Sequence, residues 1–270
     1  MKTFDCQQII KEPFKGGGSS RWNYCEGEAK GVVVLVHGLN VSVTAMQDLA
    51  CAINELGYHV LSPVLAESGS AESWIESVKR SYCAAKLKFP DLPINGVGHS
   101  AGGASILAFM AKYQNRYFDA VVLLAPALSI TRASWVVRPL TPLRYLGLSL
   151  PSFSPKKHKR SSFTPLGAYN ALFDLASSLQ DLKKGSAATL EGFASARGVV
   201  LISPADGLVR YNGVKRWLKE QNLKWRLVTL RPQHTNGLIA DHLLFDKETM
   251  GKSWEKMLKI MQETLTYYKS

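Results

Sequence analysis

Short runs of consecutive apolar residues alternate along the chain with longer segments in which apolar residues recur every three or four positions. The first run covers residues 32–36 and stops at His37 and Gly38. A strand without polar alternation is buried on both faces, as in a parallel sheet that helices cover on each side. The segment that follows, VTAMQDLACAINELG, has helical spacing and closes at Gly57. It predicts an amphipathic helix.

The cycle of strand and helix then repeats. Further strands are predicted at YHVLSP, INGVG, FDAVVLLAPA, RGVVLISPADG and LKWRLVTLRP, and further helices at residues 70–89, 100–113 and 253–268. This alternation is typical of the α/β class, with a doubly wound, mostly parallel sheet. A chain of 270 residues is long enough for one such domain, so we expect residues 1–270 to form a single unit.

About seventy residues, between a strand that ends near Ala127 and one that begins at Gly198, do not follow this cycle. Their first half is rich in proline, aromatic residues and arginine, and their second half contains GAYNALFDLASSLQDLKK, which has helical spacing. Long insertions in compact domains are usually lids or binding loops. We therefore predict a cap over residues 129–197; the alternative, a disordered surface loop, fits only residues 155–162.

Hydrophobic residues make up 46% of the chain and charged residues 20%, which excludes a disordered protein. The net charge of +12 suggests an anionic partner, but basic residues are concentrated only in PKKHKR, residues 155–160. This single short block does not indicate a nucleic-acid-binding surface. It predicts weak contact with anionic membranes through the following residues: Lys156, Lys157, Lys159 and Arg160.

The four cysteines are Cys6, Cys25, Cys51 and Cys83, and they form neither a CxxC pair nor a zinc-type spacing with histidine. We therefore expect no metal site and no disulfide framework, with a Cys6–Cys25 pair only in an exported protein. The N-terminal region lacks the apolar core of a signal peptide, and no run of about 18 apolar residues occurs. These features predict a soluble, cytoplasmic protein, and they leave its oligomeric state open.

The stretch GHSAG, residues 98–102, fits the pattern G-x-S-x-G and lies between a predicted strand and a predicted helix. So tight a turn requires Gly98 and Gly102, because side chains there would collide with neighbouring elements. It would present the Ser100 hydroxyl at the carboxyl end of the sheet, beside the N–H groups that begin a helix. We interpret Ser100 as a nucleophile; the alternative is a turn with a packing role only.

A serine nucleophile needs a base and an acid that orients the base. Asp206 follows a predicted strand in PADGLV and suits the acid, although Asp-Gly also occurs in ordinary turns. Two histidines follow the last strand, His234 in RPQHTNG and His242 in IADHLLFD. We favour His242, since apolar residues after it could anchor its loop, and His234 remains the alternative.

The reaction also needs two N–H donors for the oxyanion. VHGLN supplies Leu39, Ala101 supplies the second donor, and His37 is expected to organise this loop without transferring protons. The remaining histidines are His59, His99 and His158, which we interpret as strand, turn and surface residues respectively.

Four motifs, VHGLN, GVGHSAGG, SPADGLV and DHLLFD, together resemble the α/β-hydrolase family, in which serine, acid and histidine follow in this order. The segments GYHVLSPVLAESG, SWIESV and HLLFD are most similar to its carboxylesterase and monoacylglycerol-lipase-like branch. The resemblance covers about residues 31–268, apart from the predicted cap. It implies a catalytic triad of Ser100, Asp206 and His242, with Leu39 and Ala101 as oxyanion donors.

The combined expectation is a serine esterase or lipase that cleaves a carboxylic ester through an acyl-enzyme on Ser100. Apolar residues of the cap favour a small-molecule or lipid ester with an apolar acyl chain, which we expect Trp135, Leu146 and Phe153 to contact. No cofactor or metal is expected. Two alternatives remain: a thioesterase or acyltransferase with the same triad, and a catalytically silent ligand-binding protein with this fold.

Overall fold

The computed structural model describes residues 4–13, 18–66, 70–114, 117–131, 136–152, 154–182, 193, 196–233 and 240–266. Within these ranges the centre of the protein is a seven-stranded sheet with the order β1-β3-β2-β4-β5-β8-β9. Its strands are β1 (Gly18–Asn23), β2 (Gly31–Val36), β3 (Tyr58–Val64), β4 (Ile94–His99), β5 (Ala120–Leu124), β8 (Arg197–Ile202) and β9 (Arg226–Thr229). Only β1 runs antiparallel to its neighbour, so the predicted doubly wound, mostly parallel sheet is confirmed.

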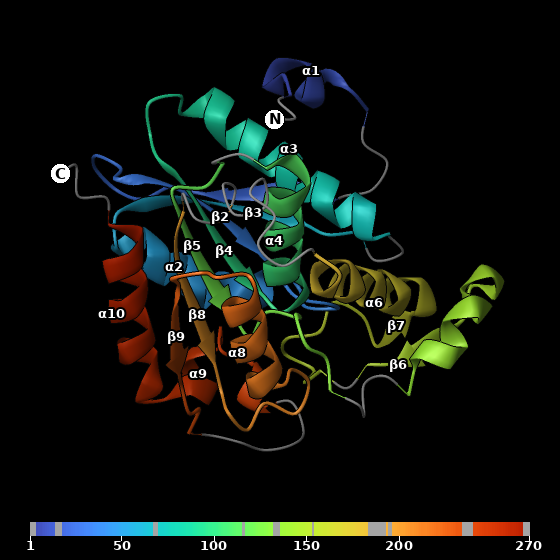
Figure 1. Ribbon diagram of the computed structural model, residues 1–270. Helices are drawn as coiled ribbons and strands as arrows, with labels where there is room; N and C mark the ends of the chain where they lie inside the picture. Colours follow the sequence, from blue (N-terminus) through green and yellow to red (C-terminus); the bar gives the residue numbers. More distant parts are fainter. Residues whose placement is uncertain are drawn as a thin grey trace.

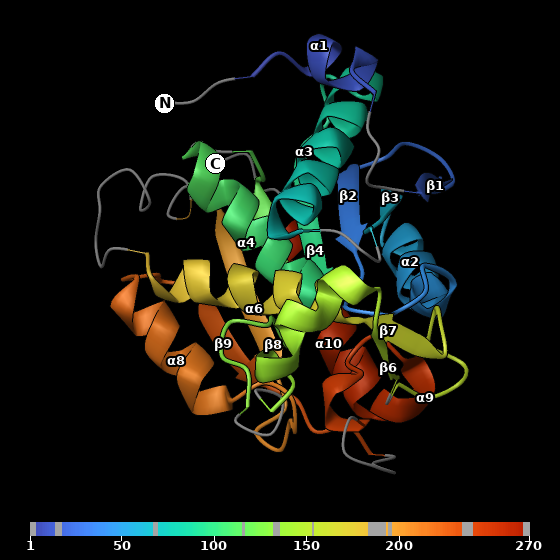
Figure 2. The ribbon, with the colours of Figure 1, turned by 90° about the vertical axis from the view of Figure 1, so that its right-hand side faces the viewer.

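Helices cover both faces of the sheet (Figures 1 and 2), which is why β2 and β5 are apolar and buried along their whole length. One face carries α2 (Gln47–Glu55), preceded by η1 (Thr44–Met46), and α10 (Ser253–Leu265). The other face carries α3 (Ala71–Lys88), α4 (Ala101–Tyr113) and α8 (Tyr211–Glu220). All these helices were predicted except α8, a short helix of 10 residues whose buried face includes Val214, Trp217 and Leu218.

The direction in which successive strands are added to the sheet reverses between β2 and β4. From β2 it continues to β3 on one side, whereas from β4 it continues to β5 on the other. The carboxyl ends of β2 and β4 therefore open onto a crevice of the kind in which α/β sheets bind ligands. Because Val36 of β2 pairs with Gly98 of β4, the loops that follow these two strands lie side by side.

The segment between β5 and β8 forms a separate layer near this crevice. Its elements are η2 (Arg138–Leu146), β6 (Ser149–Pro151), β7 (Phe163–Pro165) and α6 (Leu166–Gln180). Strands β6 and β7 pair in a small antiparallel sheet, and α6 packs against α4 and η2. The helix predicted in this segment is thus confirmed, while the division into a domain and a cap at residues 129–197 stays a prediction.

A disulfide joins the N-terminal helix α1 (Cys6–Lys11) to α3. It links Cys6 with Cys83, so the expectation of no disulfide, and of Cys6–Cys25 as the only pairing, is wrong. The two cysteines are 77 residues apart, and their Cα atoms come within 4.9 Å only because α1 packs on α3. Cysteine spacing cannot reveal such a pair.

No helix in the described part of the chain combines the length and hydrophobicity that a membrane-spanning segment needs. The cytoplasmic location stays a prediction.

Candidate active site

Ser100 stands on a strained turn between β4 and α4. Its backbone has φ +52° and ψ −116°, a conformation that residues other than glycine rarely adopt. Main-chain hydrogen bonds hold the turn: the Ser100 N–H donates to the Leu124 oxygen at 2.9 Å, and the Ala127 N–H donates to the Ser100 oxygen at 3.0 Å. Strain that the surrounding structure enforces in this way is typical of functional positions.

The glycines around Ser100 allow close contact between backbones. A Cβ atom on Gly98 would lie 2.7 Å from the Gly103 Cα, and one on Gly102 would overlap the main-chain oxygens of Val36 and His37. The first turn of α4 thus touches the end of β2. The crowding predicted for both glycines is confirmed.

The loop after β2 runs beside Ser100. A Cβ atom on Gly38 would lie 3.2 Å from the Ser100 Cβ, so the adjacent Leu39 also lies at the crevice. Ala101 is the first residue of α4, and its N–H has no acceptor within the helix. The two residues predicted to supply the oxyanion donors therefore flank Ser100, and their role stays a prediction.

His37 fixes the loop that carries Leu39. Its Nδ1 donates to the Gly38 oxygen at 2.8 Å, and its Nε2 accepts from the Leu65 N–H at 3.0 Å. A ring that uses both nitrogens in this way is neutral, and burial lowers the pKa of His37 to about 4. This arrangement supports the interpretation that His37 organises the loop.

Asp206 and His242 meet in a buried pair at the same edge of the sheet. His242 Nδ1 donates to Asp206 Oδ2 at 2.7 Å, and the Asp206 side chain is 0% exposed. The other carboxylate oxygen accepts from the N–H groups of Leu208 and Val209 at 2.8 and 2.9 Å. Burial alone would raise the pKa of Asp206, but His242 and these hydrogen bonds outweigh it and lower the pKa. In a neutral imidazole the ionised carboxylate keeps the ring proton on Nδ1, so Nε2 carries the lone pair that can accept a proton.

His99 joins this pair to the turn of Ser100. Its ring lies 4.8 Å from the His242 ring, centroid to centroid, and its Nε2 donates to the His242 main-chain oxygen at 2.9 Å. Within the described part of the chain, no hydrogen bond joins the Ser100 hydroxyl to the His242 side chain. Such contacts often form fully only when substrate binds.

A second hydrogen bond supports the loop of His242. The hydroxyl of Ser203, at the end of β8, donates to Asp241 Oδ1 at 2.7 Å. Neither Asp241 nor His99 was recognised from the sequence as a residue that supports the site. Asp241 lies within the motif IADHLLFD, but nothing in that pattern indicates its partner.

Four further predicted residues have different outcomes. His234, Trp135 and Phe153 lie outside the described residues, so the choice of His242 over His234 and the two substrate contacts stay predictions. Leu146 ends η2 with 71% of its surface exposed, and its contact with an acyl chain is also still a prediction.

The basic segment at residues 155–160 is not a freely exposed charge cluster. Lys157 pairs with Asp246 at 3.2 Å and with Glu248 at 2.5 Å, while Arg160 donates to the Leu65 oxygen at 2.9 Å. His158 is 3% exposed. Its interpretation as a surface residue is therefore wrong, because Asp246 and Phe245, which come from a distant part of the sequence, pack against it. Apart from the bridge at Lys159, residues 155–162 form an irregular and partly exposed segment. Membrane contact through Lys156, Lys157, Lys159 and Arg160 stays a prediction.

Residues 27–269 match the model of the hydrolase family described as "Serine aminopeptidase, S33". The chain belongs to this family. The match spans the whole sheet from β2 onward, the turn of Ser100 and the loop of His242. It confirms the resemblance to the α/β-hydrolases. Comparison with curated protein sequences finds no match.

Solved structures with a similar fold are lipases and esterases. A soluble variant of monoglyceride lipase from Saccharomyces cerevisiae has a TM-score of 0.70 and 13% identity, over 94% of this chain and 93% of that chain. Monoacylglycerol lipase from Paleococcus ferrophilus has a TM-score of 0.69 and 17% identity, over 92% and 98%. A carboxyl esterase from Bacillus coagulans has a TM-score of 0.69 and 14% identity, over 91% and 94%. At these identities the likeness establishes the fold.

Proposed function

We propose that this protein is a serine hydrolase that cleaves carboxylic esters through an acyl-enzyme on Ser100. The observation that carries the proposal is the buried His242–Asp206 pair, which His99 ties to the strained turn of Ser100. The family is one of hydrolases, and structures of similar fold carry the names of monoacylglycerol lipases and a carboxyl esterase, which favours an ester as substrate.

In the first half of the reaction, the Ser100 Oγ attacks the ester carbonyl carbon and its proton passes to His242 Nε2. The tetrahedral intermediate then collapses, the alcohol leaves with the proton from His242, and the acyl group remains on Ser100. Water repeats the sequence and releases the acid. Asp206 keeps the proton of His242 on Nδ1, so that Nε2 faces the reaction, and it stabilises the imidazolium that forms.

The N–H groups of Leu39 and Ala101 bind the oxyanion of both tetrahedral intermediates. Leu39 lies in the loop after β2, which His37 fixes, and Ala101 is the first residue of α4. Preorganised donors of this kind act on charge that exists only in the transition state, and each contributes about a hundredfold to a thousandfold in rate.

A small cavity of about 20 Å³, roughly the space of one water molecule, lies beside the oxyanion loop. Its lining is mainly apolar and includes Leu39, Leu65, Trp74, Pro165 and Ala168. These residues come from the loop after β2, the end of β3, α3 and the layer around β7 and α6. These apolar side chains favour an apolar group next to Leu39, and an acyl chain would enter only if the cavity widened.

The proposal is tested with p-nitrophenyl esters of increasing acyl length and the variant Ser100→Ala. We expect measurable turnover by the wild type and a loss of at least about a thousandfold in the variant. Ser178→Ala is the matched control, because the Ser178 hydroxyl only donates to the Leu175 oxygen of its own helix. Its turnover should equal that of the wild type.

Labelling by a fluorophosphonate probe identifies the nucleophile directly. Ser100 should be labelled in the folded wild type and in Ser178→Ala. Absence of labelling would favour a catalytically silent binding protein. Peptide anilides, acyl-CoA and added alcohols serve as further substrates, and faster turnover of an amide or thioester, or transfer to an alcohol, would contradict ester hydrolysis as the main activity.

A further inference from the structure

One side of the segment at residues 157–161, which we name the clasp segment, pairs with the loop after β2. Val41 and Lys159 form an isolated antiparallel bridge. The flanking main-chain hydrogen bonds run from the Ser42 N–H to the His158 oxygen (3.0 Å) and from the Arg160 N–H to the Asn40 oxygen (3.1 Å). The clasp segment thus lies along the oxyanion loop as a short added strand.

The side chain of Asn40 strengthens this pairing. Its amide nitrogen donates to the Ser161 oxygen at 2.9 Å, and its amide oxygen accepts from the Ser161 N–H at 3.0 Å. The same nitrogen donates to the Thr164 hydroxyl at 3.0 Å. Asn40 has φ +50° and directly follows Leu39. The residue next to a proposed oxyanion donor is therefore held in a left-handed conformation by the clasp segment and its continuation.

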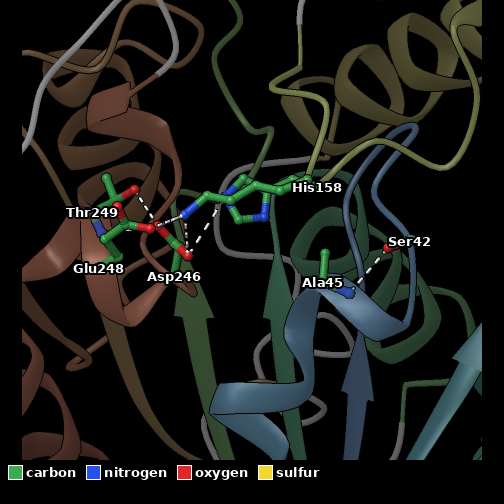
Figure 3. Close-up of polar contacts among 7 residues, drawn as sticks. Ser42, Ala45, His158, Asp246, Glu248 and Thr249 are labelled. Atoms are coloured by element: carbon green, nitrogen blue, oxygen red, sulfur yellow. Dashed lines mark hydrogen bonds and ion pairs between the residues drawn. The ribbon is translucent and has the colours of Figure 1, made fainter.

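The other side of the clasp segment contacts the loop of His242 (Figure 3). The buried His158 has its Nε2 3.5 Å from Asp246 Oδ1, and Lys157 Nζ lies 3.2 Å from the same oxygen. Asp246 also accepts from the Thr249 N–H at 2.8 Å, at the start of α9 (Lys247–Met250). Burial alone would raise the pKa of Asp246, but the contacts with His158 and Thr249 outweigh it and hold the pKa well below its usual range.

A path of packed rings continues from this contact to the centre of the site. Phe245 lies edge-on to His158, with ring centroids 5.4 Å apart, and edge-on to His99, at 4.7 Å. The loop itself is tightly turned, since the Leu244 N–H donates to the His242 oxygen at 2.9 Å. Asp246, Phe245 and His242 therefore belong to one compact unit, which the clasp segment contacts from outside.

We propose that the clasp segment positions the oxyanion loop and the loop of His242 relative to Ser100, with Asn40 and His158 as its positioning residues. The inference rests on the proposed function, because it concerns the same site. The basic block at residues 155–160 therefore has a structural role. Its side chains and backbone connect the oxyanion loop with the loop of His242, and no other described segment connects these two loops in this way. Neither Asn40 nor His158 touches the reacting atoms.

The effect expected from such positioning falls on kcat. A donor displaced from the place where charge develops loses transition-state stabilisation, whereas ground-state binding of the ester depends less on that donor. A residue that merely supports the fold would instead lower the amount of active protein and leave kcat per labelled site unchanged. The ratio of kcat to labelled Ser100 separates these cases.

The first test is Asn40→Gly, which deletes the amide but keeps a backbone that tolerates φ +50°. Asn222→Gly is the matched control, since Asn222 is exposed and has φ +51° at the end of α8. With p-nitrophenyl butyrate we expect kcat of Asn40→Gly to fall about tenfold to a hundredfold with KM within about threefold, and Asn222→Gly to equal the wild type. An unchanged kcat in Asn40→Gly, or a change in KM alone, would overturn the proposal.

The second test uses His158→Phe, which keeps a ring beside Phe245 but lacks the nitrogen that lies 3.5 Å from Asp246 Oδ1, and His158→Gln, which keeps a polar group there. We expect His158→Phe to lower kcat and His158→Gln to restore most of it. The double variant Asn40→Gly with His158→Phe should lose less than the product of the two single losses, because both open the same clasp. Losses that simply multiply would show two independent contacts and would contradict a clasp.

Two readouts distinguish failure of this inference from failure of the proposed function. The rate of fluorophosphonate labelling of Ser100 depends on the oxyanion loop and needs no ester, so it should also fall in Asn40→Gly. Hydrogen exchange should show protected Ser42 and Arg160 amides in the wild type and faster exchange in the variant. A wild type that labels but cleaves no ester would refute the proposed function only. Labelling and exchange that do not respond to Asn40→Gly would refute the clasp.

Discussion

His99 donates its Nε2 hydrogen to the main-chain oxygen of His242 at 2.9 Å, so the residue before Ser100 holds the loop of the proposed base. A carbonyl oxygen only accepts hydrogen bonds, which fixes the proton of this ring on Nε2. Burial, followed by the neighbouring His242, lowers the pKa of His99 to about 3. The ring is therefore neutral near pH 7, and its Nδ1 has no hydrogen-bond partner among the described residues.

This relationship predicts the behaviour of two variants at position 99. His99→Phe fills the ring's space but cannot hold the His242 oxygen, so we expect kcat/KM for an ester to fall about tenfold to a hundredfold. His99→Gln keeps a donor and should retain most of the activity. Steady-state kinetics and fluorophosphonate labelling measure both. Equal activity of the two variants would show that the hydrogen bond does not position His242.

Two buried neutral histidines predict a loss of stability in mild acid. The pKa values of His37 and His99 are about 4 and about 3 in the folded protein, against about 6.5 in an unfolded chain. The unfolded chain therefore binds more protons below about pH 6.5, so their contribution to the free energy of unfolding is complete above that pH and is lost as the pH falls toward 4. Over this pH range each histidine changes the free energy of unfolding by about 1 kcal/mol per pH unit.

Urea unfolding at several values between about pH 7.5 and 4.5 measures this slope. His99→Gln should remove roughly half of it. Asp206 and Asp246 do not interfere, because their lowered pKa values affect stability only below the usual carboxyl range. A free energy of unfolding that stays constant over this interval would contradict the buried neutral state of both rings.

Crowding around the turn of Ser100 predicts opposite outcomes for two glycines of β4. Gly98→Ala would place a Cβ 2.7 Å from the backbone of Gly103, so we expect about 2 kcal/mol or more of destabilisation and much slower labelling of Ser100. Gly96→Ala would place a Cβ 3.4 Å from the side chains of Ile106 and Phe118, which is ordinary contact. Its unfolding free energy should change by less than about 1 kcal/mol. Similar losses in both would argue against the close contact.

The disulfide predicts a definite thiol count. Cys25 is buried and Cys51 exposed, so iodoacetamide should modify one thiol in the native protein, two after denaturation without reductant, and four after reduction. Mass spectrometry counts the modified thiols in each of the three states. We expect Cys83→Ser to lower the free energy of unfolding by about 2–4 kcal/mol. Four reactive thiols without reductant would agree instead with a reducing compartment, in which such bonds are uncommon.

The predicted membrane contact can be tested at the residues of the basic segment and of η2 that are exposed. Lys156 is exposed, and η2 with its preceding turn exposes apolar side chains: Val136, Leu140, Leu143, Tyr145 and Leu146. Sedimentation with phosphatidylcholine vesicles, with and without phosphatidylserine, should show binding only to the anionic ones and weaker binding at high salt. Lys156→Glu should reduce it more than Lys224→Glu, a charge change elsewhere on the surface. Binding indifferent to phosphatidylserine would refute the contact.

Local patterns predicted the parts of the site that depend on local geometry. A turn as tight as that of Ser100 requires glycine at positions 98 and 102. The two glycines between an apolar strand and a helix therefore predicted the turn from the local sequence. Most of the sheet was equally accessible, because strands buried on both faces have apolar sequences. The edge strand β1 was missed, since its sequence GSSRWN is largely polar. Helix α8 was missed although Val214, Trp217 and Leu218 have helical spacing, because it spans only 10 residues and follows the turn at Asp206 closely.

Contacts between distant residues could not be predicted in the same way. His158 stands among basic residues, and nothing near it in the sequence indicates that Asp246 and Phe245 bury it. Asn40 and Ser161 are 121 residues apart, and Cys6 and Cys83 are 77 apart. Such pairs follow from how elements pack, which a single sequence does not specify.

The separation between Asn40 and Ser161 also determines when the site is completed during synthesis. A ribosome makes β2, β4 and the turn of Ser100 well before it makes residue 161, and the loop of His242 comes later still. A chain elongated only to the end of β5 would carry the serine without its proposed base and without the segment that fixes the oxyanion loop. Under the proposed function, Ser100 would therefore become reactive late in synthesis, after most of the sheet has been made.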